Sequence, residues 1–214
     1  MTRYLQYFAL VFLTALFSTG AVANEPATAA DRAADTASVL EAKMALRDLW
    51  VEHVFWIRSF VLAAHAQDQA QRDVAEAEVV ANARALAQSV APFYGESAAD
   101  GLFDLLAGHW AAVRGFNTAT LERTAAAQQE AVDDLTANAH QIAAFLNGAN
   151  PYLPEDAVFG LLSTHGAHHV AQIKQIDAED FAGETATWHQ MRRHMSVIAD
   201  AIADALARQF PEKF

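Results

Sequence analysis

A repeat of 56 residues constrains this sequence more than any other feature. Two polar positions, with apolar residues around them, return at that interval without a gap. The first polar position is occupied by His53, His109 and His165. The second is occupied by Asn82, Asn138 and His194. Because a fixed period of this length is typical of a repeated supersecondary unit, the sequence predicts three copies of one unit.

The composition favours helices throughout the repeats. The chain is rich in Ala, contains only 9 Gly and 5 Pro among 214 residues, and has few clusters of β-branched residues. Ala is the strongest helix former, whereas Gly and Pro interrupt helices. The break near residue 117 is assigned to Asn117 and Thr118, which favour the position that precedes a helix. Six helices are predicted, at about 37–66, 71–91, 97–116, 118–148, 154–180 and 183–210.

The polar positions are also symmetric about turns of the chain. The midpoints between successive polar positions fall at 67.5, 95.5, 123.5, 151.5 and 179.5. Residues at equal distances from a turn lie at the same height in an up-and-down bundle. Each polar residue also lies on an apolar helical stripe, as His53 does between Trp50 and Ile57. We therefore predict an all-α, six-helix up-and-down bundle of three pseudo-repeated helical hairpins, with one buried polar layer.

Such a layer suits a transition-metal site. Burying an imidazole or amide without a partner costs roughly 2–7 kcal/mol, so the six side chains must satisfy one another or hold a ligand. Imidazole is a common metal ligand, and converging histidines are familiar at zinc and copper sites, with iron a further candidate. We expect Asn82 and Asn138 to orient the imidazoles through hydrogen bonds. The predicted metal ligands are His53, His109, His165 and, as a candidate fourth, His194.

Two other interpretations remain open at this point. The layer is compatible with a helical ligand-binding or scaffold protein, in which buried polar groups set the helix register. It is also compatible with a small metalloenzyme, which would need a pocket that reaches the layer. His169 lies one turn after His165 on the same face, but its counterparts in the other repeats are Ile57 and Val113. Packing is therefore the simpler interpretation of His169.

Several other chemistries are excluded or disfavoured. The sequence contains no Cys, which excludes thiolate ligands and disulfides. It has no Glu-x-x-His pair of the kind found in di-iron bundles, no His-Glu-x-x-His motif and no Gly-rich phosphate loop. The formal net charge of −12 disfavours binding to nucleic acid or anionic lipid and is compatible with cationic partners such as metal ions.

The first residues have the pattern of a secretory signal peptide. A basic start at Arg3 is followed by an apolar run over 8–17 and by the small residues AVA at 21–23. We expect cleavage near Ala23 and a periplasmic or secreted protein without stable membrane insertion, because no later run approaches the roughly 20 apolar residues that span a bilayer. The chain is accordingly divided into a signal peptide (1–23), a flexible leader (24–36) and a helical bundle domain (37–214).

Several short stretches resemble a family of small all-helical bacterial proteins without an established function. The stretches include LWVEHVFWIR at 49–58, PFYG at 92–95 and QFPEKF at 209–214. The resemblance implies a helical fold over about 45–214 and the same His and Asn residues in relatives. Some members carry the product name acetylglutamate kinase, but a kinase needs a nucleotide-binding α/β fold and a phosphate loop. The resemblance therefore implies no activity.

Overall fold

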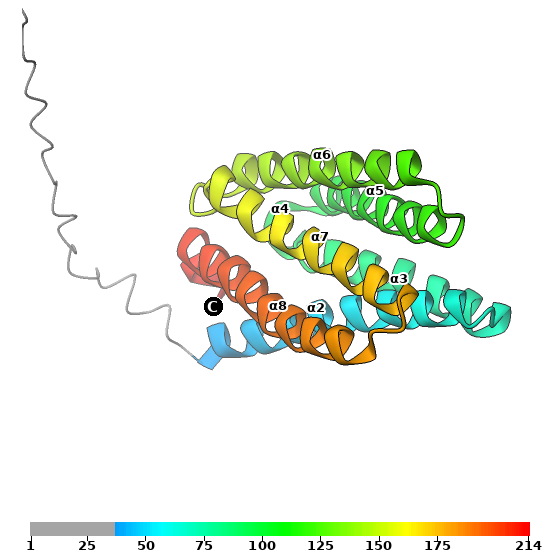
Figure 1. Cartoon of the computed structure of the whole chain (residues 1–214). Coiled ribbons are helices and arrows are strands. Elements are labelled where there is room, and N and C mark those ends of the chain that lie inside the picture. Colours follow the sequence, from blue (N-terminus) through cyan, green and yellow to red (C-terminus); the bar gives the residue numbers. More distant parts are fainter. Residues whose placement is uncertain (1–36) are drawn as a thin grey trace, which may run out of the picture.

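The computed structural model describes residues 37–214 and shows a bundle of helices joined by short turns (Figure 1). The expected signal peptide (1–23) and leader (24–36) lie outside the described residues. The predicted all-α fold is confirmed for the part described. Two short segments, α4 (Ala91–Tyr94) and the 3-10 helix η1 (Pro211–Lys213), lie at one end. The six long helices are α2 (Ala37–His65), α3 (Gln69–Gln88), α5 (Glu96–Leu121), α6 (Ala125–Ala149), α7 (Glu155–Asp177) and α8 (Phe181–Gln209).

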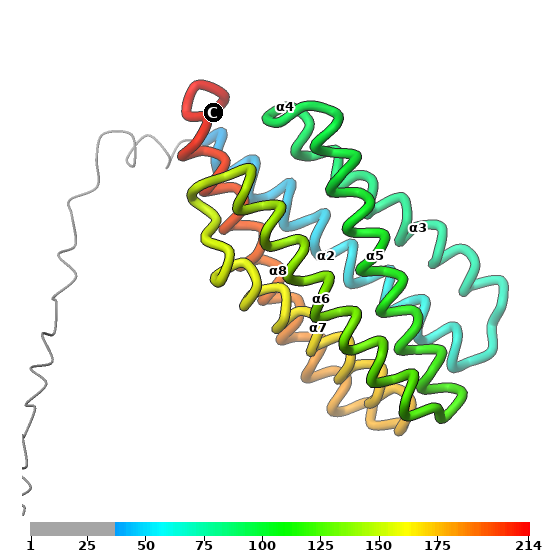
Figure 2. The backbone as a smooth tube through the Cα atoms, turned by 90° about the horizontal axis from the view of Figure 1, so that it is seen from above, coloured from blue at the N-terminus to red at the C-terminus, as the bar shows by residue number. Residues whose placement is uncertain are grey.

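The six long helices close into a ring in which each packs against the next along the chain. The ring closes because α8 packs back against α2, so the first and last long helices lie side by side (Figures 1 and 2). Contacts also cross the interior, since α7 touches both α2 and α5. The inner surfaces of α2, α5 and α7 therefore meet near the centre of the bundle.

Three of the turns share one backbone conformation. Gln67, Arg123 and Glu179 adopt left-handed φ values of 58°, 58° and 56°, and they are 56 residues apart in the sequence. In each turn, the following N–H donates to the carbonyl five residues earlier, which satisfies a carbonyl at the helix end as a Schellman motif does. These bonds are Asp68 to Ala63, Thr124 to Ala119 and Asp180 to Gln175, each 2.9 Å.

The predicted break at Asn117 and Thr118 is wrong. Helix α5 continues to Leu121, and α6 begins at Ala125 after Thr124. Asn117 is buried inside α5, where its Oδ1 lies 3.0 Å from Nε2 of His65. Its side chain is therefore used in a contact between helices rather than as a helix cap.

Apolar clusters lie on both sides of the first polar position. One includes Trp50 and Leu106, towards the end of the bundle that carries α4. The other includes Ile57 and Phe116, towards the opposite end. Because His53 follows Trp50 and precedes Ile57 on the same buried face of α2, a polar layer lies between two apolar ones.

Candidate metal centre

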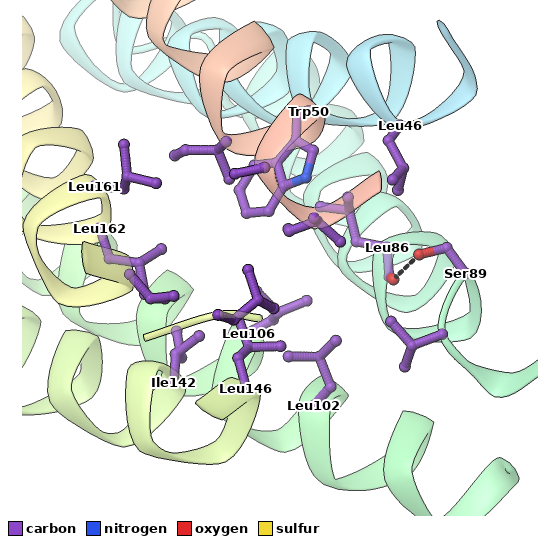
Figure 3. Close-up of a pocket in the computed structure, with 16 residues that line it drawn as sticks. Leu46, Trp50, Leu86, Ser89, Leu102, Leu106, Ile142, Leu146, Leu161 and Leu162 are labelled. Carbon is purple, nitrogen blue, oxygen red and sulfur yellow. Dashed lines mark hydrogen bonds between the residues drawn. The ribbon is translucent and has the colours of Figure 1, made fainter. Parts of the chain in front are cut away.

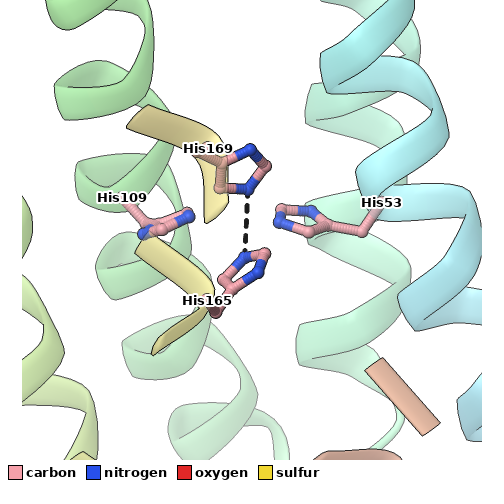
Figure 4. Close-up of side chains that lie close together, drawn as sticks. All are labelled: His53, His109, His165 and His169. Atoms are coloured by element: carbon pink, nitrogen blue, oxygen red, sulfur yellow. Dashed lines mark hydrogen bonds between the residues drawn. The ribbon is translucent and has the colours of Figure 1, made fainter. Parts of the chain in front are cut away.

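Four buried histidines converge in the middle of the bundle. Three inner helices supply them, and the rings point toward one another (Figure 4). Each residue offers one ring nitrogen such that these atoms all lie within 4.8 Å of one another. The four are His53 from α2, His109 from α5, and His165 and His169 from α7, with exposed fractions of 2%, 7%, 1% and 1%.

The spacing of the group is close to what a tetrahedral metal requires. Metal–nitrogen bonds of 2.0–2.1 Å place tetrahedral ligand atoms about 3.3 Å apart. His165 and His169 are four residues apart on α7, and their Nε2 atoms are already separated by 3.1 Å. The widest separation in the group, up to 4.8 Å, must shorten by about 1.5 Å, which small side-chain rotations can supply.

Burial keeps the four imidazoles neutral at neutral pH. Loss of hydration and, to a smaller extent, the neighbouring His109 lower the pKa of His53 from 6.5 to about 3. Burial also lowers the pKa of His109 to about 4. The pKa values of His165 and His169 are lowered well below 6.5, first by burial and then by the neighbouring histidines. A neutral imidazole is the form that binds a metal ion, so no proton has to leave first.

Many ring nitrogens of this group have no hydrogen-bond partner among the described residues. They include both nitrogens of His53, Nε2 of His109, and Nδ1 of His165 and of His169. The bond between the Nε2 atoms of His165 and His169 satisfies only one nitrogen of each. Because leaving a buried polar group unsatisfied costs about 1–3 kcal/mol, such a concentration points to an external ligand.

The second polar position does not enter the histidine group. At each of its three occurrences, the side chain donates to the carbonyl four residues before His53, His109 or His165. It therefore contacts the helical turn that carries that histidine. The distances are 3.0 Å for Asn82 to Leu49, 2.9 Å for Asn138 to Leu105 and 2.8 Å for His194 to Leu161. The structure thus places His53, His109 and His165 together, and His194 beside them on α8 with its Nε2 engaged elsewhere.

His169 is the member that sequence reasoning assigned to packing. Its counterparts Ile57 and Val113 are fully buried apolar residues, so the repeat gave no reason to expect a ligand there. The available signal was its position four residues after His165, which places both imidazoles on one helical face.

An apolar wall closes the layer on the side of α4. Trp50 packs edge-on against the rings of His53 and His165, with centroids 5.8 and 6.3 Å away. Beyond Trp50 lies a small cavity of about 50 Å³ lined almost entirely by Leu, Ile and Val side chains (Figure 3). The histidine layer is therefore bordered on that side by apolar side chains.

Comparison with known proteins identifies no relative. No protein-family model, curated protein or solved structure matches the chain. None of the described helices is both long and apolar enough to cross a membrane. Functional inference therefore rests on the histidine group itself.

Proposed function

We propose that the protein binds a transition-metal ion through His53, His109, His165 and His169. The observation that carries the proposal is the convergence of four buried, neutral imidazoles whose ring nitrogens are mostly unpaired within the described chain. A purely structural layer would satisfy its own hydrogen bonds, because unsatisfied groups destabilise the fold.

The donor set favours zinc or copper. Four imidazole nitrogens suit borderline metals such as Zn²⁺ and Cu²⁺, and also accept iron, whereas Mg²⁺ and Ca²⁺ prefer oxygen donors. The ligands are neutral, so the whole charge of the metal enters a buried site. This charge favours binding of an accompanying anion or hydroxide.

Geometry favours His169 over His194 as the fourth ligand. The Nε2 atom of His169 lies 3.1 Å from that of His165, whereas Nε2 of His194 is bonded to Leu161. Asn82 and Asn138 were expected to orient the imidazoles through hydrogen bonds to them, but each donates instead to the backbone of the turn that carries a ligand. We propose that they support the site by anchoring these turns.

The proposal includes three hairpins descended from one unit: α2 with α3, α5 with α6, and α7 with α8. The nearly equal φ values of Gln67, Arg123 and Glu179 support this proposal. So do the three hydrogen bonds from the second polar position, each of which joins residues that are 33 apart in the sequence. A repeated unit accounts for a ligand from each of the inner helices.

Export and the family resemblance also remain proposals. The pattern over residues 1–23 supports cleavage near Ala23. Amino-terminal sequencing of the protein recovered from the periplasm or medium should begin at Asn24. A sequence that begins at Met1 would contradict export by this route.

Equilibrium dialysis of the protein, purified without a His tag, tests the ligand set. We expect one zinc or copper ion per chain in the parent protein. His169→Gln should weaken binding at least tenfold, because it removes a ligand, whereas the matched variant His194→Gln should bind within about threefold of the parent. Equal losses in both variants would contradict the assignment of His169, and absence of binding in the parent would contradict the metal site.

A further inference from the structure

A groove between α6 and α7 reaches the histidine group from the side. Its volume is about 430 Å³, and its wall is mostly apolar with a few polar groups. His109 lies in the wall and is the most exposed of the four histidines, at 7% against 1–2% for the others. Its Nε2 atom has no hydrogen-bond partner among the described residues. The groove therefore reaches the ring of His109, and the Nε2 atom of this ring lies just beneath the groove wall, inaccessible to solvent.

Gly166 keeps this groove open. It is buried in the middle of α7, next to His165, and a Cβ atom built on it would meet nothing within 4 Å. Gly destabilises the interior of a helix relative to Ala, so packing alone does not account for it. The positions 56 and 112 residues earlier hold Trp110 and Val54, which are buried at 6% and 0% exposure. The third hairpin thus lacks a side chain where the other two fill the space.

Polar groups along the groove indicate what enters it. The hydroxyl of Ser163 is inaccessible to solvent and has no hydrogen-bond partner among the described residues, and Thr136 and Lys174 also line the groove. A pocket with an apolar wall and a few convergent polar groups is typical of small-molecule sites. The ammonium group of Lys174 on the groove wall, together with the positive charge of a metal bound at the histidines, favours a small anion.

We propose that this groove is the route by which a small anionic ligand reaches the metal, as a fifth ligand added beside His109 to the four histidines. The inference rests on the proposed metal site and extends it, because it makes the site open to exogenous ligands on one side. The ring of Trp50 covers His53 and His165 on the side of the bundle that carries α4.

Gly166→Val tests the route by filling the space that Gly leaves. Gly160→Val is the matched control, because Gly160 lies on the same helix, is exposed and also has nothing within 4 Å of a Cβ. In the metal-free protein, diethyl pyrocarbonate should modify His109 at least tenfold faster than His53, His165 or His169. Gly166→Val should remove that difference, whereas Gly160→Val should keep it.

The second readout uses the cobalt-substituted protein titrated with azide. Azide should change the visible spectrum of the parent and of Gly160→Val, and its affinity for Gly166→Val should fall at least tenfold while cobalt remains bound. Equal labelling of His109 in both variants, or equal azide affinity, would overturn the route and leave the metal site standing. A parent that binds neither cobalt nor zinc nor copper would overturn the metal site and the route with it, even where His109 is labelled fastest.

Discussion

Two buried polar clusters lie about one helical turn apart along α7, and they are built in opposite ways. The first surrounds Glu184, which accepts two bonds from Arg58, of 2.5 and 2.8 Å, and a third from Gln172, of 2.8 Å. These bonds lower the pKa of Glu184 and keep it charged, and the bonds from Arg58 have the largest effect. The second is the histidine group, where burial lowers each pKa and most ring nitrogens lack partners among the described residues.

The difference shows that the chain itself satisfies the buried charge of Glu184. The carboxylate of Glu184 is only 2% exposed, yet both its oxygens are paired by side chains from α2 and α7. The same two helices leave the imidazoles of His53, His165 and His169 largely unpaired. We infer that the Glu184 cluster is complete in the chain, whereas the histidine layer is completed by a ligand.

The largest expected effect is that of pH on the metal-free protein. The pKa values of His53 and His109 are about 3 and 4 in the folded state and about 6.5 in the unfolded chain, so the unfolded chain binds more protons between these values. Their contribution to stability is full above pH 6.5 and is lost as pH falls towards 4, by about 1.4 kcal/mol per pH unit for each. From pH 6.5 to 5 these two histidines should lower the free energy of unfolding by about 3 kcal/mol, and His165 and His169 should lower it further.

Urea unfolding at several pH values measures this loss. The Glu184 cluster loses its contribution only below about pH 4.5, because the pKa of Glu184 is lowered from that value. The two clusters therefore lose their contributions to stability over different pH ranges. The variant His109→Gln should remove about half of the loss of stability assigned to His53 and His109. If the free energy of unfolding of the parent stays constant between pH 6.5 and 5, the histidines are not buried and neutral.

Arg58→Leu should have the next largest effect. The variant leaves a buried carboxylate without its cation, which costs about 3 kcal/mol, the low end of the usual range because Arg58 is partly exposed. Thermal or urea unfolding measures the change. The gain in stability on adding metal should be the same as in the parent protein, because Arg58 does not belong to the histidine group; a loss of that gain would mean that the two clusters act as one.

The smallest expected effect is the difference in stability cost between substitutions at Gln172 and His169, which lie one turn apart on α7. Gln172→Leu removes a hydrogen bond to a buried charge and should cost about 2 kcal/mol. His169→Leu places an apolar side chain where the other hairpins have Ile57 and Val113, so the metal-free protein should change by less than about 1 kcal/mol. Differential scanning calorimetry of both variants checks this. A cost for His169→Leu as large as that for Gln172→Leu would favour a structural role for the layer.

The helical fold and the turns were predictable because they depend on local chemistry and on spacing. All five midpoints between polar positions, from 67.5 to 179.5, fall between the observed long helices. The break assigned to Asn117 was wrong because that residue has two uses, as a helix cap or as a buried partner, and only the fold shows its contact with His65. A local cap signal is therefore weaker than the spacing of the whole pattern.

The site was predictable only in part. Equal height in the bundle was inferred from distances to the turns, but height does not determine how far a side chain lies from the bundle axis. Asn82, Asn138 and His194 come from outer helices and reach the backbone of the inner ones. The positions 56 and 112 residues before His169 hold Val113 and Ile57 instead of histidines, so the repeat could not identify it. Its place in the group depends on the packing of α7 against α2 and α5.

The most direct test of the metal site is the melting temperature of the untagged protein with and without metal. A metal that binds only the folded state adds about 2.7 kcal/mol at one hundred times its dissociation constant, a rise of roughly 5–10 °C for a domain of this size. We expect this rise with zinc or copper in the parent protein and in His194→Gln, and none in His109→Gln, which should still fold. A parent protein whose melting temperature is unchanged by zinc, copper, iron, nickel, cobalt and manganese would contradict the metal site.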